Sequence, residues 1–168
     1  MSARQSEGAP IVSMVLEPLR VDHADEMWLV LADPALYEFT GGEPPSREAL
    51  VARYESQVSG SGVPAEQWRN WIVRRLDSAD AVGFVQATIV DGVADLAWLI
   101  GVAHQGQGSA VQAVQAMIRE LESLGIARFT AHVHRDHRRS QGVAAAIGLA
   151  RTGALDGDGE EIWSKPTA

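Results

Sequence analysis

The sequence predicts a single domain of the mixed α/β (α+β) class. Segments with strand-like and helix-like periodicity alternate along the chain, and no internal repeat interrupts them. A length of 168 residues, 46% of them hydrophobic, suits one compact domain. We expect residues 1–12, MSARQSEGAPIV, to form a flexible tail and residues 13–168 to form the domain.

The first third of the chain is expected to hold one strand and two helices. A strand over Val15 to Val21 is followed by a helix over Ala24 to Asp33, which ends before a proline. Ser46 is a candidate N-cap, with Glu48 in the first turn, for a second helix that runs to Ser59.

Three consecutive strands are expected next, over Arg69 to Arg75, Ala81 to Val90 and Ala94 to Gly101. Each of them is rich in branched and aromatic residues. Asp91-Gly92 between the last two matches a two-residue hairpin turn.

A helix, a strand, a short helix and a hairpin are expected in the remainder of the chain. Apolar residues recur at helical spacing before a capping glycine, Gly125, and they are Val111, Val114, Ile118 and Leu121. Ile126 to His134 alternates as a strand does, and an alanine-rich helix then ends at Gly148. The final hairpin is centred on Asp156 to Gly159.

Two glycines, Gly106 and Gly108, open the longer of these helices. A helix start leaves about four N–H groups unpaired and carries roughly half a positive charge, which favours anions. Glycines let a bulky anion approach the main chain, although they also serve in tight loops that bind nothing. The turn is no P-loop, because no Lys-Ser or Lys-Thr follows it, and it lacks the third glycine of the dinucleotide fingerprint.

The glycine turn resembles the signature of the GNAT superfamily of acyl-CoA N-acyltransferases. That signature is Gln or Arg, two residues, Gly, one residue, then Gly or Ala, and here it comprises Gln105, Gly106, Gln107, Gly108, Ser109 and Ala110. The strand before it and the helix and strand after it are placed as in that family. The later segments HRRSQGVAAAIGLA and GLARTG are similar to the ribosomal-protein alanine N-acetyltransferase branch. The resemblance covers Met14 to Lys165.

The resemblance implies a mixed, mostly antiparallel seven-stranded sheet, splayed between its fourth and fifth strands and flanked by about four helices. It also implies acetyl-CoA as cofactor, with the pantetheine docked on the backbone of Ile100 and Val102 by strand addition. The diphosphate would lie on the N–H groups from Gln105 through Ala110. His137 stands where the family usually has Asn, so that contact with pantetheine is expected in altered form.

The catalytic residues implied by the resemblance are Ser140 and Asp95. The Ser140 hydroxyl would donate to the departing thiolate, since Val143 stands where the family often has a tyrosine acid. The alternative for Ser140 is a helix N-cap. Asp95 would act as a base through water, and the alternative is an ordinary charged strand residue.

The acceptor pocket implied by the family lies between the loop after the first helix and the final hairpin. Its candidate residues are Tyr37, Glu38, Phe39 and Asp158, and the carboxylates of Asp156 and Glu160 also favour a cationic acceptor. The predicted reaction is direct attack of a primary amine, from a protein N-terminus or a small cationic molecule, on acetyl-CoA in a ternary complex. A weakly active acyl-CoA-binding sensor or partner-binding domain is the alternative.

Composition limits the remaining partners. A formal net charge of −8 disfavours nucleic acid and anionic membranes, so neither is expected as a partner. The chain has no cysteine, and we expect a cytoplasmic protein, with a homodimer left open. Three histidines, His132, His134 and His137, lie close in sequence, but they lack a clear carboxylate partner and no metal is expected.

Overall fold

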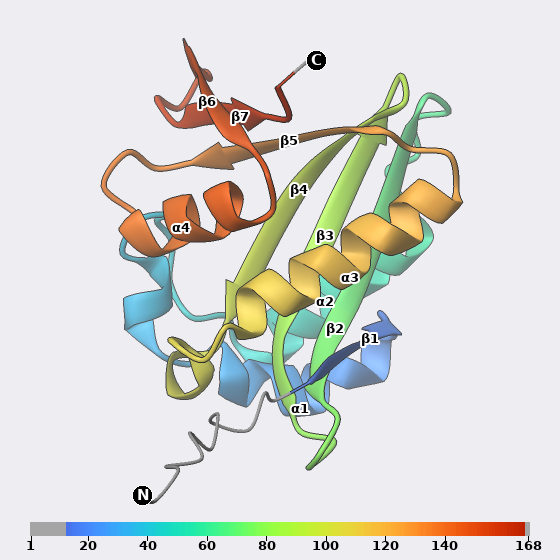
Figure 1. Ribbon diagram of the computed structural model, residues 1–168. Helices are drawn as coiled ribbons and strands as arrows, with labels where there is room; N and C mark the ends of the chain where they lie inside the picture. The colour runs from blue at the N-terminus through green and yellow to red at the C-terminus, as the bar shows by residue number, and fades with distance from the viewer. Residues whose placement is uncertain (1–12, 167–168) are drawn as a thin grey trace, which may run out of the picture.

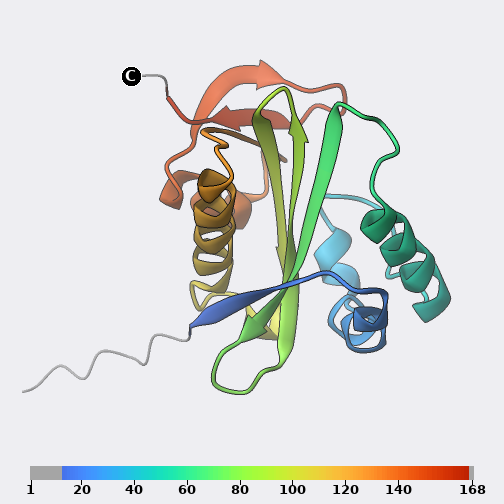
Figure 2. The same ribbon diagram turned by 90° about the vertical axis from the view of Figure 1, so that its right-hand side faces the viewer.

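A computed structural model describes residues 13–166, so the tail predicted over 1–12 lies outside the described residues. The domain is a single twisted sheet with helices on both faces, as Figure 1 and Figure 2 show. The predicted seven-stranded, mostly antiparallel sheet is confirmed, and its order is β1-β2-β3-β4-β5-β7-β6. The only parallel pair in the described part of the chain joins β4 to β5.

The strands are β1 (Met14–Pro18), β2 (Glu66–Arg75), β3 (Ala81–Val90), β4 (Val93–Ile100), β5 (Arg128–Val133), β6 (Ala150–Leu155) and β7 (Glu161–Ser164). The α-helices are α1 (Ala24–Val30), α2 (Arg47–Ser59), α3 (Ser109–Ser123) and α4 (Arg138–Ala146). Three short 3-10 helices are η1 (Val21–His23), η2 (Pro34–Tyr37) and η3 (Val102–His104). Among the described residues, no helix is long and apolar enough to cross a membrane.

The two faces of the sheet bury separate apolar clusters. The larger cluster lies under α3 and contains Val85, Leu96 and Met117. The smaller one lies under α1 and α2 and contains Ile72 and Leu50. Neighbouring strand residues enter opposite clusters because side chains alternate between the faces of a strand. Residues of the central strands β2, β3 and β4 therefore face α3 and the α1–α2 pair alternately.

The turns that the sequence predicts are confirmed. Asp91 and Gly92 join β3 to β4 with φ of +50° and +73°, as a two-residue hairpin of this type requires. Gly125 follows α3 with φ of +87°, and the Ile126 N–H donates back to the Leu121 carbonyl. The Ser46 Oγ accepts from the Ala49 N–H and caps α2.

Several predicted boundaries are wrong by a few residues. The first strand ends at Pro18 rather than at Val21, because Val21 already belongs to the 3-10 helix η1. The first helix ends at Val30 because Asp33 caps η2 instead, accepting from the Ala35 N–H. The second strand begins at Glu66, where it still pairs with Val90 of β3.

The expected fifth strand over 126–134 is also too long. It begins at Arg128, because Ile126 is used in the cap of α3. The final hairpin is present, but β7 lies between β5 and β6, so that β6 forms the edge of the sheet. The order places the turn of this hairpin, residues 156–160, beside β5.

Parallel pairing between β4 and β5 stops well before either strand ends. It runs from Val93↔Arg128 to Leu96↔Ala131, whereas β4 continues to Ile100 and β5 to Val133. The two strands therefore separate beyond Leu96, as predicted, and Figure 1 shows the opening facing α4.

A charged network ties β1 to β2 and α1. Arg74 of β2 contacts the carboxylates of both Glu17 and Glu26, and its Nη1 lies 3.0 Å from Glu26 Oε2. Hydrogen bonds from Arg74 and then from Arg20 lower the pKa of Glu17 from 4.5 to about 2. The edge strand β1 thus depends on an ionised Glu17.

We predict that Glu17→Gln lowers the free energy of unfolding at neutral pH and that the deficit shrinks in acid. Because the pKa of Glu17 is depressed in the fold, its contribution is complete above 4.5 and is lost as the pH falls through about 2. Urea unfolding at several pH values measures this. The control is Glu120→Gln on the exposed face of α3, and a deficit that stays constant down to pH 2 would contradict the prediction.

Candidate functional site

A cleft of about 360 Å³ lies where β4 and β5 separate. The loop after η2, the ends of both strands, the start of α4 and the β6–β7 turn all contribute to it. Its lining is Phe39, Thr40, Asp95, Leu96, Ala97, Trp98, His132, Val133, His134, His137, Ser140, Asp156 and Glu160. The cleft therefore gathers side chains from four parts of the chain that are distant in the sequence: the loop after η2, β4, the β5–α4 segment and the β6–β7 turn.

The glycine turn before α3 has the backbone geometry of an anion site. Gly106 and Gly108 have φ of +75° and +77°, which a residue with a side chain rarely adopts. A Cβ at either position would meet no atom within 4 Å, so the approach to the main chain is open. No side chain caps α3, and the Oγ of Ser109 is buried without a hydrogen-bond partner among the described residues. These features fit a diphosphate on the α3 N-terminus.

Gln105, at the start of the glycine turn, makes contacts within the protein through both its backbone and its side chain. Its N–H already donates to the Val102 carbonyl at 3.3 Å, so it is not free for a diphosphate as the neighbouring amides of the turn are. Its side chain instead bridges two elements, because Nε2 donates to the Ile100 carbonyl at 2.9 Å and Oε1 accepts from Arg139 of α4. Gln105 thus connects the end of β4 to α4 at the edge of the cleft.

The residues predicted to dock pantetheine, Ile100 and Val102, lie where β4 ends. Ile100 is the last residue of β4, and its carbonyl is occupied by Gln105. Val102 lies in η3, whose 3-10 backbone cannot extend a β ladder. The part of β4 left unpaired by β5 is Ala97 to Ile100, which is where a further strand can add.

At the start of α4, the side chains of His137 and Ser140 line the cleft. His137 is the N-cap residue, and its ring stacks on Phe39 with 4.5 Å between centroids. Burial lowers the pKa of His137 below 6.5, so its ring is neutral at pH 7. Ser140 lies inside the helix, with its Oγ 3.5 Å from His137 Nε2. The N-cap alternative for Ser140 is therefore wrong, because His137 holds that position.

Asp95, His132 and Asp156 form a chain of ionisable groups across the cleft. His132 Nδ1 lies 2.7 Å from Asp156 Oδ2, and its Nε2 lies 3.6 Å from Asp95 Oδ1. A carboxylate only accepts, so the Nδ1–H of His132 donates to Asp156 and Nε2 of the neutral ring is left as an acceptor. The Thr130 hydroxyl donates to Asp95 Oδ1 at 3.1 Å and fixes that carboxylate.

The pKa values of this chain depart from their usual range. Burial raises the pKa of Asp95 above 3.8. Burial also opposes charge on His132, but the hydrogen bond to Asp156 and the charge of Asp95 outweigh it and raise the pKa of His132 above 6.5. The hydrogen bond from His132 lowers the pKa of Asp156. His132 is thus an oriented base that titrates above its usual range.

The predicted acceptor residues do not all reach the cleft. Phe39 lines it, whereas the Tyr37 hydroxyl donates to the Leu31 carbonyl at 2.9 Å and Glu38 is exposed beside it. Asp158 lies exposed at the tip of the final hairpin, where its N–H donates to Asp156. Asp156 and Glu160 line the cleft instead.

In the sequence, His132 is only one of three clustered histidines. These three do not form a metal site together, because His134 and His137 both contact Phe39 while His132 contacts Asp95 and Asp156. The one group with the spacing of metal ligands in the described chain is His132, Asp156 and Glu160, whose ligand atoms lie within 4.8 Å of one another. Strand alternation puts His132 and Thr130 on the face of Asp95, but only the register of β4 and β5 shows that they meet.

Comparison with known proteins identifies the family of the chain. The family model of the acetyltransferase (GNAT) domain matches residues 13–150. No curated protein matches the sequence significantly.

Solved structures share the fold at low identity. An acetyltransferase from Thermus thermophilus has 22% identity and a TM-score of 0.75, over 94% of this chain and 99% of that one. The microcin C7 self-immunity acetyltransferase MccE, solved with acetyl-CoA and AMP, has 18% identity and a TM-score of 0.75, over 92% and 93%. RimL, the ribosomal L7/L12 α-N-protein acetyltransferase, has 14% identity and a TM-score of 0.77, over 94% and 93%.

The glycine turn at the start of α3 and the opening between β4 and β5 thus occur in a chain that the family model matches over most of its length. The predicted cofactor, acetyl-CoA, agrees with this match. The protein belongs to the GNAT acetyltransferase family.

Proposed function

We propose that the protein transfers an acetyl group from acetyl-CoA to a primary amine by direct attack within a ternary complex. The observation that carries this proposal is the cleft between β4 and β5. It contains the end of β4 that β5 leaves unpaired, and next to it the chain of Asp95, His132 and Asp156. The candidate acceptors are a protein N-terminus and a small cationic amine, since the solved structures that share the fold include both RimL and the aminoglycoside acetyltransferase AAC(6')-Ib.

The residues of the α3 turn would hold the cofactor. The N–H groups from Gly106 through Ala110 suit its diphosphate, and the edge of β4 beyond Leu96 suits the amides of its pantetheine. When bound, acetyl-CoA supplies a thioester whose acetyl carbon is open to attack. Ser140 lines the same cleft, and we propose that its hydroxyl donates to the sulfur of the departing thiolate.

The acidic side of the cleft would bind and deprotonate the amine. Only a neutral amine attacks, and an α-amine with a pKa of about 7.7–8.0 is far easier to deprotonate than a lysine near 10.4. Asp95 Oδ1 and His132 Nε2 are two acceptors 3.6 Å apart, so they suit the N–H groups of one ammonium. His132, oriented by Asp156, is then the base that takes the proton.

Release of free thiol from acetyl-CoA, measured against a panel of amines, tests the proposal. A thermal shift with CoA is measured in parallel. If the protein binds CoA but none of the amines in the panel causes release of thiol, the result would contradict acetyl transfer and support the acyl-CoA sensor instead.

We predict that CoA raises the Tm and that Gly108→Val abolishes this effect. Valine would place a branched side chain over the α3 N-terminus and would strain a backbone with φ of +77°. The control is Gly125→Val at the other end of α3, where φ is +87° and the strain is similar. Unchanged CoA affinity in a folded Gly108→Val protein would refute the assignment of the turn.

Ser140→Ala is expected to lower kcat by roughly 10-fold to 1,000-fold, the range for one useful electrostatic or acid contribution. CoA affinity should change little, because the expected cofactor contacts are mostly with the backbone. Stability should change by less than about 0.5 kcal/mol, since Ser140 caps no helix. Ser56→Ala within α2 is the matched control, and a fully active Ser140→Ala enzyme would remove Ser140 from the mechanism.

Asp156→Asn is expected to lower the pKa of His132, because the hydrogen bond and charge that raise it are lost. The base must be unprotonated to act, so the acid limb of the pH profile of kcat/KM should move to lower pH. NMR titration of His132 checks the pKa directly. The control is Asp80→Asn, a distant substitution that removes the same charge. An acid limb that stays in place would exclude His132 as the base.

A further inference from the structure

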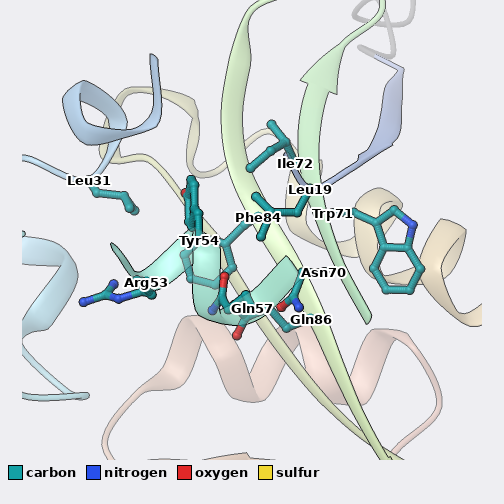
Figure 3. A pocket seen from close by; sticks show the side chains of 10 residues that line it. All are labelled: Leu19, Leu31, Arg53, Tyr54, Gln57, Asn70, Trp71, Ile72, Phe84 and Gln86. Atoms are coloured by element: carbon teal, nitrogen blue, oxygen red, sulfur yellow. The ribbon is translucent and has the colours of Figure 1, made fainter. Parts of the chain in front are cut away.

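A second cavity, of about 220 Å³, lies between α2 and the strands β2 and β3, on the α1–α2 face of the sheet (Figure 3). Its lining consists of Leu19, Leu31, Arg53, Tyr54, Gln57, Asn70, Trp71, Ile72, Phe84 and Gln86. Figure 3 shows Tyr54 and Gln57 directed from α2 toward the strands, where Asn70 and Gln86 lie side by side. Trp71 points away from these four side chains.

Two buried polar atoms of this cavity have no partner among the described residues. They are the hydroxyl of Tyr54, which is 4% exposed, and Oε1 of Gln57. Buried polar groups are almost always hydrogen-bonded, because leaving one unpaired costs about 1–3 kcal/mol. Both come from neighbouring turns of one helix face and line one cavity, which points to a ligand that pairs with them.

The two atoms define the chemistry of that ligand. Burial raises the pKa of the Tyr54 phenol, so it remains a protonated donor. Gln57 Oε1 only accepts, and therefore the ligand must offer one acceptor and one donor. No carboxylate lines the cavity, and its one charged residue is Arg53, which disfavours a second ammonium group. Four apolar side chains, Leu19, Leu31, Ile72 and Phe84, complete the wall.

Paired residues of neighbouring strands connect the lining of the cavity to the lining of the cleft. Gln86 of the cavity pairs with Ala97 of the cleft, and Asn70 pairs with Gln86. Residues paired across strands share one face, so these three side chains form a row beside Thr88 and Asp95, which pair with each other. Strand spacing puts Gln86 about 8 Å and Asn70 about 12 Å from Asp95.

We propose that this second cavity is a specificity subsite for the acceptor, in which Tyr54 and Gln57 bind an uncharged peptide group of the segment that follows the reactive amine. A peptide carbonyl accepts from Tyr54, the next N–H donates to Gln57, and a small side chain contacts the apolar wall. The subsite rests on the proposed acetyl transfer, and it selects peptide N-termini over polyamines.

Three acceptors test the subsite. Alaninamide reaches only the cleft, trialanine amide spans about 10 Å and reaches the cavity, and spermidine carries additional charges. We expect trialanine amide to have a KM at least about 10-fold below those of the other two. Tyr54→Phe and Gln57→Leu should each raise the KM for trialanine amide about 10-fold, as expected for one hydrogen bond, and leave alaninamide unaffected.

If Tyr54 and Gln57 had a purely structural role, Tyr54→Phe and Gln57→Leu would lower the free energy of unfolding. The subsite predicts a different result. Because the Tyr54 hydroxyl is unpaired in the fold, its removal should leave the free energy of unfolding unchanged or higher. Gln115→Leu, on the exposed face of α3, is the matched control for Gln57→Leu. A preference for spermidine, or equal changes in KM for alaninamide and trialanine amide, would overturn the subsite.

Calorimetric binding of trialanine amide to the CoA complex separates the two proposals. Binding that weakens in Tyr54→Phe without any thiol release would support the subsite and refute the transfer. Transfer to alaninamide together with no binding advantage for trialanine amide would refute the subsite alone.

Discussion

The site depends on the early end of the parallel pairing between β4 and β5. The two strands pair only from Val93↔Arg128 to Leu96↔Ala131 and then separate, while β3 continues to support β4 as far as Ile100. Backbone groups of β4 beyond Leu96 therefore lie in a cleft instead of a sheet interior. Gln105 and Arg139 connect the end of β4 to α4 at the edge of this opening, and the helix brings His137 and Ser140 to it.

The alternation of side chains along β4 separates two chemical environments. Leu96 belongs to the cluster under α3, and Trp98 packs against that cluster, on the side where the glycine turn lies. Asp95 and Ala97 face the opposite side, toward α1 and α2. A cofactor bound at α3 and an acceptor bound beside α2 would thus meet through the opening between β4 and β5, which is consistent with direct transfer in a ternary complex.

Charge is distributed unevenly along the acceptor side. The cleft contains three carboxylates, from Asp95, Asp156 and Glu160, whereas no carboxylate lines the second cavity. An amine is therefore favoured in the cleft, and an uncharged group is favoured in the second cavity. The net charge of −8 is consistent with attraction of a cationic acceptor, but the local arrangement of carboxylates decides where its amine lies.

The sequence by itself determined the features that depend on local chemistry. The Asp91-Gly92 hairpin, the Ser46 cap and the glycine turn before α3 all follow from residues adjacent in the chain, because φ preferences and capping act over a few residues. Only the tertiary structure decided the stack of Phe39 on His137, the contact of His132 with Asp95 and Asp156, and the cavity beneath Tyr54. These contacts join distant segments, and they depend on strand register and helix packing, which residue spacing alone does not fix.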